Sequence, residues 1–240
     1  MKNEELKEPG FFGTPMNRGS FFRYSGAALA TTALVMSGCK KDEDDPEPTP
    51  SPTPSGDTVD LGSNDIGVLN YAYALEQLEA AFYIKVVDSL PIAGMNAEEE
   101  EIMTDLMNHE IAHRDFLKAA LGASAIQDLH VDFSSINFTS RASVLATAKA
   151  FEDLGVSAYN GAGKLIEDEI YLGIAGKIVS VEARHAAAIR DLLNPNSADF
   201  AGNDVVTVED GLDMKRTPAQ VLAIAGTYIV ENLDASHLPS

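Results

Sequence analysis

The residues NHEIAHRDF, at positions 108–116, contain two overlapping metal-binding patterns. Read from His109, they spell H-E-x-x-H, the helical signature of zinc proteases, in which two histidines one turn apart bind zinc and the glutamate is the general base. Read from Glu110, they spell E-x-x-H, which puts a carboxylate and an imidazole on one helix face and supplies half of a di-iron or di-manganese site. The two readings predict different chemistry, and internal repeats in the chain distinguish them.

A second E-x-x-H occurs further along the chain, without the additional histidine. Glu182 and His185 match the first motif, but Val181 stands at the position that His109 occupies there. The E-x-x-H pattern therefore repeats, whereas H-E-x-x-H does not, and no clear third zinc ligand is present. We interpret His109 as a helix-surface residue or as a hydrogen-bond partner of a ligand, rather than as a ligand.

Two other segments, LEQLEAAFY and FEDLGVSAY, also match each other. Their alignment pairs Glu76 with Glu152 and Tyr83 with Tyr159. The chain thus carries Glu, E-x-x-H, Glu, E-x-x-H on four successive segments, and four carboxylates with two imidazoles suit two iron or manganese ions, although zinc would also bind. The predicted metal ligands are Glu76, Glu110, His113, Glu152, Glu182 and His185.

The repeat leaves the roles of three neighbouring residues open. Glu79 is an alternative ligand to Glu76, but it aligns with Gly155, which has no ligand atom, so Glu76 is preferred. Glu79 could then accept a hydrogen bond from a ligand histidine. Tyr83 and Tyr159 share a helix face with their glutamates, and either a hydrogen bond to a ligand carboxylate or plain core packing would explain them.

Apolar residues recur at spacings of three and four along four stretches of the chain, as expected for amphipathic helices. Asn64 or Asp65 can cap the first helix, and Gly122 follows the end of the second. Two helical hairpins joined by one long connection, residues 123–139, predict an all-α four-helix bundle. The four helices are expected at 64–90, 97–121, 140–162 and 166–193.

The C-terminal extension, residues 196–240, is expected to add one helix outside the bundle. Thr217 is a suitable cap and Pro218 a suitable first helical residue. The apolar pattern predicts that this helix extends over 217–233. The preceding VVTVEDGLD is expected to be extended.

Residues 1–38 have the organisation of a lipoprotein-type signal peptide. A polar segment precedes the apolar run SGAALATTALVM, which is too short to span a membrane. The sequence LVMSGC then resembles a lipobox, which predicts lipidation of Cys39. NRGSFFRYSG also resembles a twin-arginine signal, with Gly19 in place of the second arginine.

Residues 39–60 are acidic and rich in proline and are expected to form a linker. We therefore expect an exported protein, anchored by lipid in the cell envelope at the periplasmic face or the outer surface. The net charge of −20 argues against nucleic acid as a partner, because phosphate binding requires a basic face. The expected partners are metal ions, a small oxidant and the membrane; the oligomeric state is not predicted.

Four blocks of the sequence, LNYAYALEQLEAAFY, NHEIAHRDFL, FEDLGVSAY and VEARHAAAIRDLL, resemble the ferritin-like domain of exported bacterial proteins related to plant desiccation-related proteins. The resemblance covers residues 64–195. It implies a ferritin-like bundle with a di-metal carboxylate centre, similar to those of ferritins, rubrerythrins and manganese catalases, and it implies the same six ligands. It does not imply a particular activity.

Three functions are compatible with these residues. The first is a ferroxidase- or catalase-like oxidoreductase acting on O2, peroxide or Fe(II), in which Glu110 and Glu182 bridge two ions while Glu76 and Glu152 shift to admit the oxidant. The second is a non-catalytic envelope protein that uses the bundle for binding or desiccation protection. The third, a zinc protease using the H-E-x-x-H pattern, is the least supported.

Overall fold

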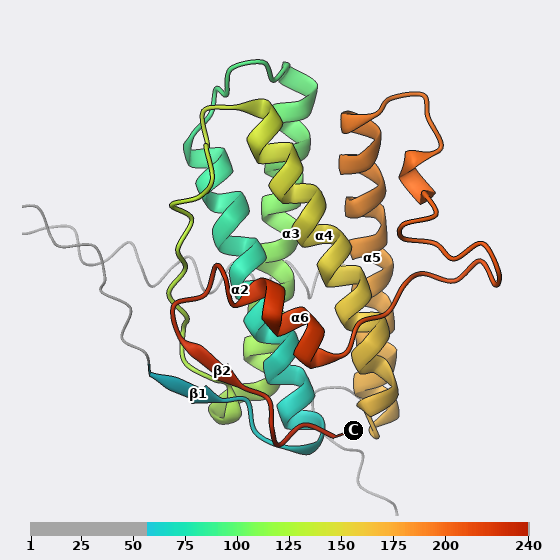
Figure 1. The fold of residues 1–240 in the computed structure, drawn as a ribbon. Coiled ribbons are helices and arrows are strands. Elements are labelled where there is room, and N and C mark those ends of the chain that lie inside the picture. Colours follow the sequence, from blue (N-terminus) through green and yellow to red (C-terminus); the bar gives the residue numbers. More distant parts are fainter. Residues whose placement is uncertain (1–56, 240) are drawn as a thin grey trace, which may run out of the picture. The chain divides into compact units, whose positions relative to one another are not determined.

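The computed structural model describes residues 57–239. Its four long helices lie side by side and form two antiparallel hairpins, α2 with α3 and α4 with α5 (Figure 1). The segment between α3 and α4 returns along the length of the bundle, so both of these helices start at the same end. The predicted all-α, ferritin-like bundle with a long crossover is therefore confirmed. The helices are α2 (Asn64–Asp88), α3 (Ala97–Leu121), α4 (Arg141–Ala162) and α5 (Glu169–Leu193).

Capping side chains determine where α3 and α4 begin. Asn96 accepts hydrogen bonds from the backbone N–H groups of Glu98 and Glu99, and the Glu99 carboxylate accepts one from the N–H of Asn96. Such reciprocal bonds satisfy N–H groups that have no partner within the helix. Ser140 caps α4 by accepting the backbone N–H of Ser143 at its hydroxyl oxygen. At the other end of α3, Gly122 has φ of 54° and ends the helix as predicted.

The start of α5 differs from its apolar pattern, which predicts Ile166. Gly163–Leu165 form a short 3-10 helix after α4, and Asp168 then caps α5 by accepting the N–H groups of Ile170 and Tyr171. The helix therefore starts at the residue after this cap, three positions later than predicted.

The predicted caps of α2, Asn64 and Asp65, are wrong. Ser63 occupies the N-cap position and makes no side-chain capping bond. The Asp65 carboxylate instead accepts the backbone N–H groups of Glu167 and Asp168, at 2.9 and 2.8 Å. It thereby ties the beginning of α2 to the beginning of α5.

Helix α2 is buried on most of its circumference, because the long connection and the C-terminal extension cover the side that faces away from the bundle. Its Phe82 contacts Phe133 and Phe138 of the connection at ring-centre distances of 6.1 and 5.9 Å. The buried Asn70 donates to the carbonyls of Leu61 and Ser124. These contacts hold the coil next to α2, and the buried amide of Asn70 has its hydrogen-bond partners there.

The helix of the C-terminal extension is shorter than predicted. Helix α6 (Pro218–Ala225) begins with a capping box formed by Thr217 and Gln220, but it ends at Ala225 and not at residue 233. The chain then turns, and β2 (Asn232–Asp234) pairs in parallel with β1 (Thr58–Asp60). Pairing with β1 requires extended backbone, which outweighs the helical pattern. Strand β1 also shows that the last residues assigned to the linker are part of the fold.

Residues 196–216 are attached to the bundle through Arg190 of α5, whose side chain is 1% exposed. Its guanidinium pairs with Asp153 of α4 at 2.7 Å and with Asp204 of the extension at 2.8 Å. The expected extended segment VVTVEDGLD instead turns, and one isolated bridge between Val206 and Asp213 closes it.

The predicted signal peptide, Cys39 and most of the linker lie outside the described residues. Within residues 57–239, no helix is long and apolar enough to cross a membrane.

Candidate metal centre

All six predicted ligands converge in the interior of the bundle. The E-x-x-H spacing directs Glu110 and His113 inward from α3, and it does the same for Glu182 and His185 of α5. Helices α2 and α4 each contribute one glutamate. The four glutamates are fully buried, and each pair of helices contributes three of the six side chains.

The ligand atoms form two groups of four that share two glutamates. Within each group, the atoms lie within 4.8 Å of one another. Glu110 turns Oε1 toward Nδ1 of His185, at 2.8 Å, and Oε2 toward Nδ1 of His113, at 3.5 Å. The oxygens of Glu182 are arranged the other way round. Its Oε1 is 2.8 Å from Nδ1 of His113, and its Oε2 is 3.2 Å from Nδ1 of His185. We call the group of Glu76, Glu110, His113 and Glu182 the His113 position. The group of Glu110, Glu152, Glu182 and His185 is the His185 position.

The chemistry of these atoms fits divalent metal ions. Although several nitrogen–oxygen distances are short, eight buried atoms of these six side chains have no hydrogen-bond partner among residues 57–239. Buried polar atoms are rarely left without partners, and a cluster of unpaired oxygen and nitrogen atoms is what a metal ion requires. The eight atoms are Glu76 Oε2, both oxygens of Glu110, His113 Nδ1, Glu152 Oε2, both oxygens of Glu182 and His185 Nδ1.

Without metal, protons must compensate part of this buried negative charge. Burial raises the pKa of Glu76 well above its usual value and that of Glu152 to about 8. Burial opposes charge on the two imidazoles, but the surrounding carboxylates outweigh it and raise the pKa of His113 and His185 to about 12. Burial also favours protonated Glu110, yet the two imidazoles lower its pKa to about 2. In the metal-free centre, protons on these side chains thus offset part of the negative charge. Metal ions that bind there would displace those protons.

The two tyrosines cross between the hairpins. Tyr83 of α2 donates a hydrogen bond to Oε1 of Glu152, and Tyr159 of α4 donates one to Oε1 of Glu76, both at 2.5 Å. Burial, followed by the adjacent carboxylate, raises the pKa of each tyrosine, so both hydroxyls remain protonated donors. Of the two interpretations that the sequence left open, the hydrogen bond to a candidate ligand is correct. Each bond leaves Oε2 of its glutamate facing the centre.

Glu79 is buried but belongs to neither position. Its Oε1 lies against Gly155, where an added Cβ would be 3.0 Å away, so the glycine in the repeat leaves space for this carboxylate. Burial and the charge of Glu110 raise the pKa of Glu79 well above its usual value. Within the described residues, neither His113 nor His185 donates a hydrogen bond to Glu79, the role that the sequence left open for it.

This arrangement predicts different effects for two substitutions on α2. Glu76→Ala should eliminate the ion at the His113 position, because that position loses a ligand oxygen. Glu79→Ala should retain both ions with changed affinity, because it removes only a nearby buried charge. Elemental analysis of both variants checks this. A Glu79→Ala protein without metal, beside a loaded Glu76→Ala protein, would reverse the assignment.

His109 lies on the exposed surface of α3 and contacts the centre only through His185. Its Nδ1 is 3.0 Å from Nε2 of His185, the nitrogen that faces away from the two metal positions. Burial, followed by the charge of His185, lowers its pKa. The interpretation of His109 as the partner of a ligand histidine agrees with this contact, although the sequence does not show which histidine it contacts.

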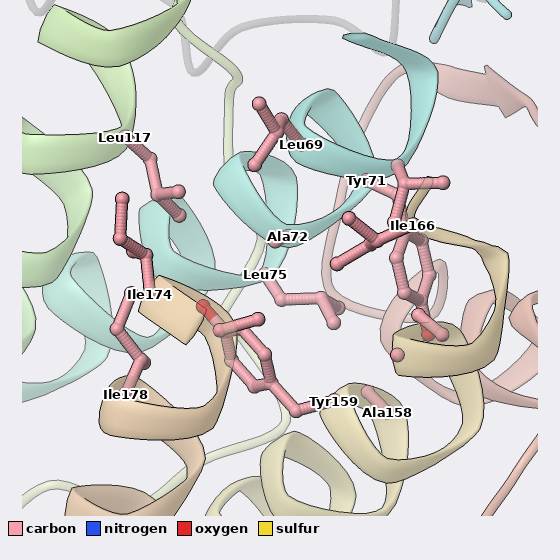
Figure 2. Close-up of a pocket in the computed structure, with 14 residues that line it drawn as sticks. Leu69, Tyr71, Ala72, Leu75, Leu117, Ala158, Tyr159, Ile166, Ile174 and Ile178 are labelled. Atoms are coloured by element: carbon pink, nitrogen blue, oxygen red, sulfur yellow. The ribbon is translucent and has the colours of Figure 1, made fainter. Parts of the chain in front are cut away.

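A small apolar cavity lies beside Tyr159. Figure 2 shows side chains from α2, α3 and α5 gathered around its ring, among them Leu75, Leu117 and Ile178. The cavity has a volume of about 20 Å³, and a cavity of about 10–15 Å³ can hold one water molecule. Tyr71 also lines it, and its buried hydroxyl has no hydrogen-bond partner within the described part of the chain. The sequence gives no signal for this cavity, because its lining residues resemble ordinary core.

Comparison with known proteins agrees with this architecture. A search of curated proteins found no match. The model of a protein family described as a ferritin-like domain matches residues 64–195, the segment that contains all four long helices and the six converging side chains. The chain belongs to the ferritin-like domain family.

Proposed function

We propose that this protein binds two iron or manganese ions and carries out oxidoreductase chemistry on O2, peroxide or Fe(II). One observation carries the proposal: Glu110 and Glu182 each direct one oxygen to the His113 position and the other to the His185 position. Two carboxylates shared in this way would hold two ions close together. Bound there, the ions would supply adjacent sites at which a small oxidant can bind and exchange electrons.

The charge of the centre favours two divalent ions. Four glutamates contribute four negative charges at full ionisation, and two divalent ions would balance them. Buried carboxylates without such compensation are costly, because a low-dielectric interior solvates charge poorly. Oxygen-rich sites with two imidazoles suit iron and manganese, and zinc is the expected competitor.

Glu76 and Glu152 are the residues best placed to admit a substrate. Each belongs to one position only, and each is held through its Oε1 by a tyrosine of the other hairpin. Tyr83 and Tyr159 therefore orient the two terminal carboxylates while remaining protonated. The cavity beside Tyr159 is small and apolar, which suits the approach of a small oxidant better than that of a large organic substrate.

Oxidant consumption tests the proposed chemistry. The full chain loaded with Fe(II) or Mn(II) should consume O2 or hydrogen peroxide faster than the same concentration of free ion, because the bundle holds two ions together. The matched control is Glu182→Ala, which removes one shared carboxylate. A loaded wild-type protein no faster than the free ion would reject catalysis and favour the non-catalytic envelope protein.

We also propose that the domain is exported and anchored by lipid on Cys39, on the basis of the lipobox-like LVMSGC alone. Cys39→Ser should move the protein from the detergent-extracted membrane fraction to the soluble fraction, because the modified thiol is lost. Fractionation followed by immunoblotting measures this. Membrane association that is unchanged in the variant would contradict the lipid anchor.

A further inference from the structure

The two hairpins carry the same site residues, with one exception that touches a ligand histidine. The candidate ligand glutamates, the ligand histidines and the two tyrosines that contact them are matched between the hairpins, each pair lying at equivalent places in its helix. The residue four positions before the histidine of E-x-x-H is not matched. It is His109 on α3 and Val181 on α5. The His113 and His185 positions therefore differ outside their ligand sets.

His109 and His185 are arranged for a directed hydrogen bond. Their rings are parallel to within 5°, with centres 5.2 Å apart, while the two nitrogens are 3.0 Å apart. The ring-centre distance exceeds the nitrogen–nitrogen distance by about two ring radii, so the rings lie edge to edge in nearly one plane. This is the favourable direction for an N–H···N hydrogen bond, in which the donor, hydrogen and acceptor are close to a line.

The tautomer of His185 follows from this geometry. Its Nδ1 faces Glu110, Glu152 and Glu182, and a nitrogen that binds metal carries no proton. With an ion bound at Nδ1, the proton of the neutral ring would be on Nε2, which would donate to Nδ1 of His109. A hydrogen-bond acceptor at this outer nitrogen fixes the orientation of a ligand imidazole and increases its basicity toward the metal.

His113 has no equivalent support. Its Nδ1 faces the centre as that of His185 does, but no hydrogen bond to its Nε2 occurs among the described residues. By the repeat, the residue corresponding to His109 is Val181, whose side chain cannot accept a hydrogen bond. The His113 ring is also the more exposed of the two, with a side-chain exposure of 15% against 5% for His185.

We propose that His109 is a positioning residue that makes the two metal positions unequal. By accepting the Nε2 proton of His185, it strengthens the His185 position, so that this position binds its ion more tightly than the His113 position does. The centre would then hold one firmly bound ion and one that exchanges with solution. This inference rests on the proposed di-metal function and adds an order of affinity to it.

Mn(II) titration of the full chain, followed by calorimetry, tests this order in two single-position backgrounds. Glu76→Ala retains the His185 position, and Glu152→Ala retains the His113 position. Adding His109→Val to the first should weaken Mn(II) binding by about 10–100-fold, the usual effect of losing a hydrogen-bond partner of a ligand. Adding it to the second should leave the affinity unchanged. His109→Gln, which retains an acceptor oxygen, should recover part of the loss.

The converse substitution provides a gain-of-affinity test. Val181→His in the Glu152→Ala background gives His113 the partner that it lacks, so Mn(II) binding at the His113 position should become tighter. Equal weakening of both backgrounds by His109→Val would indicate a purely structural role and overturn the inference, as would no weakening in either. Two equal affinities in the wild type would contradict the inference alone, whereas no Mn(II) uptake by the wild type would also contradict the proposed function.

Discussion

Glu110→Ala should weaken both metal positions together, in contrast to substitutions at the unshared glutamates. Glu110 directs one oxygen to each position, so its loss removes a ligand from both. Loss of a residue that only supports a ligand typically weakens metal binding by about 10–100-fold, and loss of a ligand should exceed this. Mn(II) titration should therefore detect no ion at concentrations that saturate the wild type.

The matched control is Glu101→Ala, which removes an exposed glutamate from the same helix. This variant should bind as the wild type does, because Glu101 belongs to neither position. If Glu110→Ala lost one ion and retained the other at wild-type affinity, Glu110 would not be shared. The two positions would then be independent sites and not a di-metal centre.

Metal should stabilise the fold substantially. An ion present at 100 times its Kd adds about 2.7 kcal/mol to the free energy of unfolding, provided that it does not bind the unfolded chain. For a domain of this size, about 2–4 °C of Tm per kcal/mol gives a shift of about 5–10 °C. Thermal unfolding of the full chain, monitored by circular dichroism with and without Mn(II), measures the shift, and a chelator should reverse it.

Glu110→Ala again provides the control, because its Tm should not depend on Mn(II). Its metal-free form should be less stable than the metal-free wild type, because His113 and His185 both lose the carboxylate that lies next to them in the interior. A wild-type Tm that a chelator leaves unchanged would mean that the buried carboxylates do not share metal.

The helices and the set of converging side chains follow from local patterns in the sequence. The three-residue spacing of E-x-x-H directs its glutamate and histidine to one face, so Glu110 and His113 must point the same way from any regular helix. The repeat then selects Glu76 over Glu79, because the position equivalent to Glu79 is Gly155. The structure shows Glu79 packed against this glycine and outside both groups.

Features that depend on contacts distant in the sequence could not be predicted in the same way. The helical pattern of residues 217–233 continues past Ala225, but pairing between β2 and β1 requires extended chain there. Asp65 has the composition of a helix cap, yet its carboxylate binds the backbone before α5. Which glutamate each tyrosine contacts, and which histidine His109 contacts, likewise depends on how the two hairpins meet.

The central claim is tested most directly by the metal content of the full chain. At equilibrium with excess Fe(II) or Mn(II) in a dialysis buffer, elemental analysis corrected for the free ion should find close to two ions per chain, one for each group of four ligand atoms. The same treatment of Glu110→Ala should leave almost none. A wild-type chain that retains no iron, manganese or zinc would contradict the di-metal centre.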